Sequence, residues 1–156
     1  MKKRLFIMFS ITVGICAAYV WLNHRDVRII NAVRDSSVAV IVVENFPISD
    51  SARIKWWLTN KALLSDKFNI PAEEKGGPDH FVIYDFGDGY REEGSRDRYC
   101  LSNVPSPVNC VDKNTLMVVD RNRKGERSFL IGNTVYLQNN KDKSVVRSKG
   151  ENKNEN

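Results

Sequence analysis

The chain has 156 residues, of which 42% are hydrophobic and 28% charged, a balance that suits one small folded domain and excludes collagen-like, coiled-coil and wholly disordered chains. The net charge is +5, and the excess lies at the two ends, because residues 5–140 carry sixteen basic and sixteen acidic side chains. Each phosphate contact needs a cation, so the neutral central part predicts that nucleic acid is not a partner.

The first predicted element is an apolar helix over residues 5–22, LFIMFSITVGICAAYVWL. A helix of this length reaches about 27 Å, nearly the thickness of a hydrocarbon core. Three cations precede it, and Tyr19 and Trp21 lie near its far end, where amphipathic rings favour the membrane interface. We therefore expect a single span through the lipid bilayer, with residues 1–4 in the cytoplasm and residues 23–156 outside.

The same segment permits a second interpretation, a cleaved signal peptide that releases a soluble exported domain. Cys16 and Ala18 are small enough for the two cleavage-site positions, but the apolar run continues to Leu22, which favours an uncleaved anchor. Ser10, Gly14 and Ala18 recur at intervals of four. Such a stripe lets two helices approach closely, so it is a candidate homo-oligomer contact, although small residues are common in membrane helices.

The exported part begins with two β-rich runs, 27–33 and 38–44, joined by a turn. Ser49 or Asp50 can then cap a helix, which we expect to run from residue 51 to 68 and to end before Pro71. At 100° per residue, five apolar residues gather on the side expected to face a sheet: Ile54, Trp57, Leu58, Leu64 and Phe68.

Trp56 and Leu63 fall almost opposite that side of the predicted helix. An aromatic and an aliphatic side chain on the solvent side of a helix indicate a candidate partner contact. The same spacing is also typical of a helix that is covered on both sides, or of one that is broken near Asn60.

Further strands are predicted over 80–86 and, as a polar edge strand, over 90–101, followed by a meander over 115–120, 126–131 and 134–137. Residues 141–156 are polar, and we expect them to be disordered. Strands on both flanks of one main helix indicate an α+β domain over residues 23–140 with a mostly antiparallel sheet, carried by the transmembrane helix.

Cys100 and Cys110 are the cysteines outside the apolar segment. Export places them in an oxidising compartment, where thiols pair, so a structural disulfide is expected. A zinc site needs four ligands and the exported part adds only His24 and His80, while a redox pair usually has the C-x-x-C spacing. We expect no metal or other cofactor.

His80 next to Asp79 is the best candidate for enzyme chemistry, as a small exported hydrolase using His80 and nearby carboxylates. Adjacent strand residues point to opposite faces, however, and no nucleophile stands out. The expectation is therefore a protein that is not an enzyme.

Several segments together resemble a known family: VAVIVVENFP, KWWLTNKALL, FNIP, GDGYREE, and the pair YCL and CVDKN. The family is that of enterobacterial putative membrane proteins of unknown function, and the likeness spans residues 2 to about 138 without the tail from Lys141. The resemblance implies a Gram-negative host, an inner-membrane anchor and a periplasmic domain, and it implies no enzyme class.

These observations favour a membrane-tethered periplasmic module that binds another protein, such as an immunity factor against an envelope toxin or an accessory to an envelope complex. The periplasmic hydrolase is the alternative.

Overall fold

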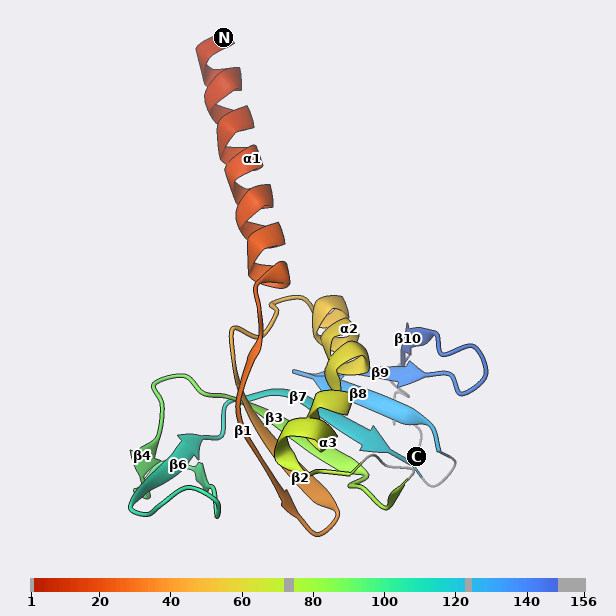
Figure 1. Cartoon of the computed structure of the whole chain (residues 1–156). Coiled ribbons are helices and arrows are strands. Elements are labelled where there is room, and N and C mark those ends of the chain that lie inside the picture. Colours follow the sequence, from red (N-terminus) through yellow and green to blue (C-terminus); the bar gives the residue numbers. More distant parts are fainter. Residues whose placement is uncertain (1, 72–74, 123–124, 149–156) are drawn as a thin grey trace, which may run out of the picture.

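The computed structural model describes residues 2–71, 75–122 and 125–148, and its N-terminal helix stands away from a folded domain (Figure 1). This helix, α1 (Lys2–His24), has 23 residues and extends past both ends of the predicted span. Within it, Phe6–His24 is apolar and long enough to cross a membrane, and none of that segment is buried inside the structure. The same properties suit a membrane anchor or a signal sequence.

The domain is built on one seven-stranded sheet with the order β1-β2-β3-β7-β8-β9-β10. Strands β2 and β3 are parallel, and the other neighbouring pairs are antiparallel, which confirms the predicted α+β class. The crossover between β2 and β3 contains α2 (Asp50–Asn60) and α3 (Ala62–Phe68). The strands are β1 (Arg28–Asp35), β2 (Val38–Glu44), β3 (His80–Asp85), β7 (Thr115–Arg121), β8 (Arg127–Ile131), β9 (Thr134–Gln138) and β10 (Val145–Arg147).

The single helix expected over residues 51–68 is divided at Lys61, next to the position where a break was considered. The Lys61 N–H still donates to the Trp57 carbonyl at 3.0 Å, whereas the Leu64 N–H donates back to the Lys61 carbonyl at 3.2 Å. Asn69 then ends α3 in a left-handed conformation with φ of +58°, as is common after a helix.

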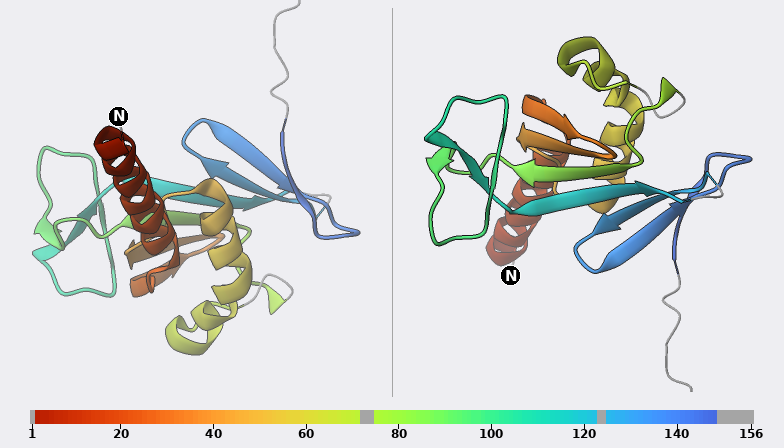
Figure 2. Two further views of the ribbon diagram at one scale, coloured as in Figure 1. Left: turned by 90° about the horizontal axis from the view of Figure 1, so that it is seen from above. Right: turned by 90° about the horizontal axis from the view of Figure 1, so that it is seen from below.

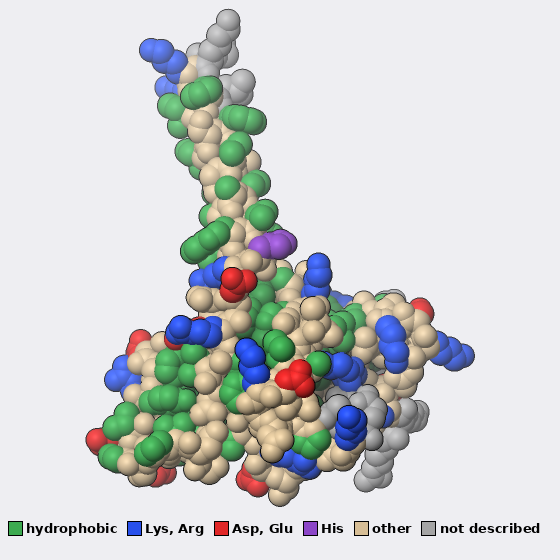
Figure 3. Space-filling model, viewed as in Figure 1, with side chains coloured by type: hydrophobic (Ala, Val, Ile, Leu, Met, Phe, Trp, Pro, Cys, Tyr) green, Lys and Arg blue, Asp and Glu red, His purple; other side chains and the backbone are tan. Residues whose placement is uncertain are grey.

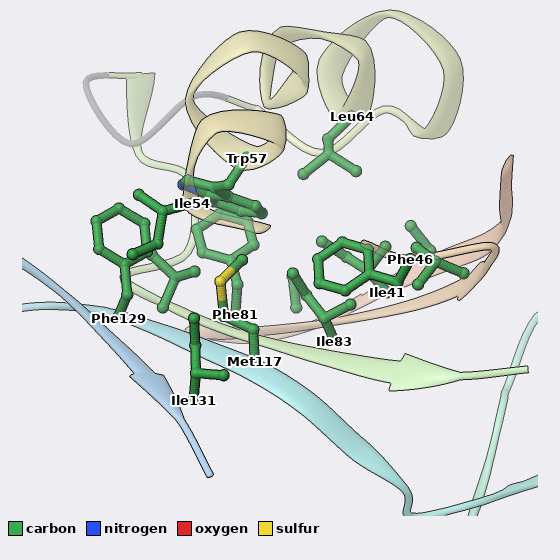
Figure 4. Close-up of a cluster of buried hydrophobic side chains, with 14 of the residues drawn as sticks. Ile41, Phe46, Ile54, Trp57, Leu64, Phe81, Ile83, Met117, Phe129 and Ile131 are labelled. Carbon is green, nitrogen blue, oxygen red and sulfur yellow. The ribbon is translucent and has the colours of Figure 1, made fainter. Parts of the chain in front are cut away.

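The main core lies between these helices and one face of the sheet (Figure 4). The predicted sheet-facing side is confirmed, because Ile54, Trp57 and Leu64 are buried while Leu58 and Phe68 pack against the same cluster. Trp57 meets Phe81 edge to face, with ring centroids 4.7 Å apart. Full burial of each large apolar side chain contributes about 1.5–3 kcal/mol, so this cluster is the main source of stability.

A separate three-stranded sheet, with the order β4-β6-β5, packs on the other face of the main sheet near β2 and β3. Its strands are β4 (Arg91–Glu92), β5 (Arg98–Cys100) and β6 (Val108–Asp112). Leu101 and Val111 are fully buried there against Val40, Val42 and Tyr84. The polar edge strand predicted over 90–101 is therefore wrong, since this segment forms two short strands outside the main sheet.

The expectation that the chain is disordered from Lys141 is also wrong for the residues the structure describes. Val145–Arg147 forms β10, which pairs with β9 so that Val146 lies opposite Leu137. The Ser148 N–H then donates to the Val135 carbonyl at 2.8 Å. The folded domain thus continues past residue 140, and residues 149–156 lie outside the described part.

The end of α1 is joined to the start of α2 by side chains as well as by the chain. Ser49 is the N-cap residue of α2, as predicted, but it makes no side-chain cap bond. Its hydroxyl and its backbone N–H both donate to Asn23 Oδ1, each at 2.8 Å. Because only residues 25–27 separate α1 from β1, this contact gives the domain a second point of attachment to α1.

Candidate functional site

The two faces of the seven-stranded sheet are covered to different extents. Neighbouring residues of a strand point to opposite faces, so the exposure of Phe129 and Leu130 in β8 shows how well each face is covered. Phe129 is fully buried under the helices, whereas Leu130 is 39% exposed on the other side. Figure 2 shows α2 and α3 along one side of the sheet and the three-stranded sheet at the end away from β10. Among the residues that the structure describes, no helix or strand therefore covers the second face over β8–β10.

We call this uncovered surface the open face, and it is apolar. In the sheet register Val118 lies opposite Leu130, Leu130 opposite Val135, and Leu137 opposite Val146. Val118 is half-buried, while the other four are 38–57% exposed. Soluble proteins seldom leave such contiguous apolar patches without a binding role. The open face consists of Val118, Leu130, Val135, Leu137 and Val146.

A row of polar side chains borders the open face across three strands. His80 lies opposite Asp120, and Asp120 lies opposite Ser128. The His80 ring contacts the Asp120 carboxylate, so Asp120 rather than Asp79 is its partner. Nucleophilic catalysis needs the imidazole between the hydroxyl and the carboxylate, but here the carboxylate occupies the middle position. The row therefore gives no support to a hydrolase that uses His80.

Trp56 and Leu63 do not form the exposed stripe that the helical pattern predicts. Both are half-buried, and Trp56 packs edge to face on Phe46 with ring centroids 5.2 Å apart. The cause is the loop after β2, which brings Phe46 under the outer side of α2, and the division at Lys61. The helix is covered on more than one side, which was one of the alternatives.

The predicted disulfide joins Cys100 and Cys110. The two residues lie directly opposite each other on β5 and β6, so the bond links two neighbouring strands of the three-stranded sheet. Tyr84 and Tyr99 pack beside this sheet with ring centroids 6.1 Å apart. Burial raises the pKa of both phenols above the ordinary value, since a low-dielectric environment disfavours the phenolate.

The remaining predicted site residues lie on α1. Ser10, Gly14 and Ala18 are all exposed along the helix, and a Cβ added at Gly14 would have open space around it. Their role in self-association stays a prediction. Across residues 2–71, 75–122 and 125–148, no three His, Cys, Asp or Glu side chains gather as a metal site would require.

The sequence of β8 and β9 is apolar on both faces of the strands, but this pattern does not show which face is left uncovered. Phe129, Leu130 and Ile131 are consecutive apolar residues in β8, and Val135, Tyr136 and Leu137 are consecutive in β9. Such runs indicate strands covered on both faces. The structure supplies a cover on one face only.

A single apolar helix followed by an α+β domain is the architecture of a membrane-anchored or exported protein. Comparison with family models identifies a match over residues 1–149 to the family described as enterobacterial putative membrane protein (DUF943). The chain belongs to this family. The match extends through β10, so the likeness does not stop near residue 138. No curated protein and no solved structure matches the chain.

Proposed function

We propose that this protein is a membrane-tethered binding module that holds its domain at the periplasmic side of the inner membrane and binds another protein through the open face. The uncovered apolar surface over β8–β10 is the observation that carries the proposal. Orientation follows from the three cations before the apolar span, since positive residues favour the cytoplasmic side.

The preferred partner is a protein with an apolar surface, because the apolar centre of the open face would supply most of the affinity. Arg121, Arg127 and Lys143 line a cleft on the helix side of these strands, which is the side that Figure 3 shows. The proposal for the open face therefore does not rest on their charge.

Two cellular roles suit such a module: an immunity factor that occupies a toxin active in the envelope, and an accessory subunit of an envelope complex. Both require only a folded surface held near the membrane. The neighbouring genes separate them, because a small secreted toxin next to the gene favours immunity and an envelope biosynthesis operon favours an accessory role.

Site-specific photo-crosslinking in intact host cells tests the open face. A photoreactive residue replaces Leu137 or Val146 in the full chain, and Val108 on the three-stranded sheet is the matched control, since it is 46% exposed. We expect one discrete adduct from Leu137 and Val146, with an identified polypeptide whose crosslinked segment contains apolar residues.

Introducing Leu130→Glu beside the crosslinking position should abolish the adduct, because a charge would be buried at the contact. An adduct formed equally from Val108, an adduct between two copies of this chain, or no adduct at either position contradicts the proposal.

A further inference from the structure

We infer that a cleft on the helix side of the sheet, beyond the end of α2, binds a multiply charged oxyanion such as a phosphate ester or pyrophosphate. The inference goes beyond the open face, which lies on the other side of the same strands. The cleft has a volume of about 360 Å³, which falls at the small end of the range for small-molecule sites.

The residues that line the cleft carry charge of one sign. Four of them, Lys61, Arg121, Arg127 and Lys143, are basic, and none of the described lining residues is acidic. They come from the end of α2, the β7–β8 hairpin and the β9–β10 turn, which are distant in the sequence and meet only in the fold. Cations gathered in a concave surface repel one another and focus a positive potential, and a bound polyanion relieves that repulsion.

A buried amide holds the cleft in shape. Gln138 is the buried polar residue of the described core, with 7% exposure. Its Oε1 accepts a bond from Arg127 Nη1 at 3.1 Å, and its Nε2 donates to the Lys143 carbonyl at 3.3 Å. One side chain thereby holds the Arg127 guanidinium and the backbone of the turn that carries Lys143 before any ligand binds, and such preorganisation lowers the cost of binding.

The acidic residues of the two adjoining turns are engaged within those turns. Glu126 accepts a bond from the Asn122 side chain at 2.8 Å, and Asp142 accepts bonds from the Ser144 hydroxyl and N–H at 2.7 and 3.0 Å. Those bonds from Ser144 also lower the pKa of Asp142. Lys143 itself has a left-handed backbone with φ of +59°, a conformation that costs free energy in a non-glycine residue and is concentrated at functional sites.

The position of the cleft favours a dissolved ligand over the lipids of the protein's own membrane. The N-terminus of α2 contacts the end of α1 through Ser49 and Asn23, and Lys61 follows the opposite end of this 11-residue helix. A helix of that length adds about 16 Å. The phosphate groups of a second membrane that faces the cleft would have the same chemistry as a soluble phosphate ester. The experiment below distinguishes these two sources.

The test uses the full chain in phosphatidylcholine nanodiscs. Pyrophosphate is titrated by calorimetry at constant ionic strength, and phosphatidylglycerol vesicles are offered in a separate co-sedimentation measurement. The variant is Lys61→Gln with Lys143→Gln, and the control is Lys67→Gln with Lys75→Gln, which removes the same charge from exposed residues outside the cleft. Unchanged thermal unfolding shows that both variants fold.

We expect pyrophosphate to bind with 1:1 stoichiometry, and the affinity to fall about tenfold or more in the cleft variant, because two charge-assisted contacts are lost. The control variant should bind as the unmodified protein does. If the protein binds vesicles but not pyrophosphate, and vesicle binding is lost in the cleft variant but kept in the control variant, the ligand is a lipid phosphate. Absence of both, or an equal loss in the control, overturns the inference and leaves the open-face proposal unaffected, since crosslinking at Leu137 does not depend on the cleft.

Discussion

The helix-covered face and the open face are made by the same strands and differ in what covers them. On the first, α2 and α3 bury Phe129, Met117 and Val119 completely or nearly so. On the second, the three-stranded sheet covers the part near Val40 and Tyr84, and the cover ends before β8. The apolar character of a strand therefore does not decide its burial. The connections between strands decide it, because they supply the covering layer.

Truncation of adjacent residues in β8 should separate the two faces most strongly. Phe129→Ala leaves a cavity in a closed core and should reduce the free energy of unfolding by about 3–5 kcal/mol. Leu130→Ala removes a partly exposed side chain and should cost well under about 1 kcal/mol. Denaturant unfolding of the full chain in nanodiscs, followed by tryptophan fluorescence, measures both. Equal losses would show that the open face is covered in the protein.

The disulfide should stabilise the covered end of the second face and not the open end. Cys100 and Cys110 are separated by ten positions, and closing a loop of this size contributes about 2–3 kcal/mol in the chain-entropy model. Cys100→Ser with Cys110→Ser should increase amide exchange in β5 and β6 more than in β8 and β9. Uniformly faster exchange across both sheets would contradict this division.

The contact between α1 and α2 should have a smaller effect, confined to the orientation of the domain. Asn23→Ala removes the acceptor for both bonds from Ser49 and should cost about 1 kcal/mol. Distances between spin labels on α1 and on β7 should become more broadly distributed. Asn23→Asp retains an acceptor oxygen and should preserve the narrow distribution, whereas equal broadening in both variants would assign the effect to the Asn23 amide donor.

Tyr84 of β3 and Tyr99 of β5 should make stability depend on pH only in alkali, and not near neutral pH. Burial raises the folded-state pKa of Tyr84 and Tyr99, so the fold disfavours their phenolates. Their contribution to stability is complete below the unfolded pKa of about 10 and is lost as the pH rises through the folded value. Absorbance titration at the phenolate band should show late ionisation, and Tyr84→Phe should make unfolding less sensitive to alkali.

The local patterns predicted the elements well and their long-range partners poorly. The 3.6-residue period identified Ile54, Trp57 and Leu64 as the core side of the helices, and the β-rich runs predicted β1 and β2. Nothing local marks Lys61 as a break, because lysine is a good helix former. Tyr99 pairs with Val111 in the separate three-stranded sheet. This pairing depends on tertiary contacts and has no local sequence signal.

The candidate sites were missed for a related reason. A charge sum over residues 5–140 is neutral because it averages an acidic excess before residue 115 with a basic excess after it. The cleft collects cations from three separate segments, which only the folded chain brings together. The Trp56 and Leu63 stripe was predicted from a helical wheel that ignores the loop carrying Phe46.

The connection between α1 and β1 has a consequence for where a partner can be captured. Three residues span at most about 11 Å when fully extended. The Asn23–Ser49 contact further restricts how far the domain can move away from α1. In the proposed membrane-anchored form, a domain held so closely explores a thin layer over the lipid surface, where its effective concentration is high for molecules confined to the same layer. Ligands that are themselves attached to or gathered at the bilayer gain from this two-dimensional confinement, and freely diffusing ones do not.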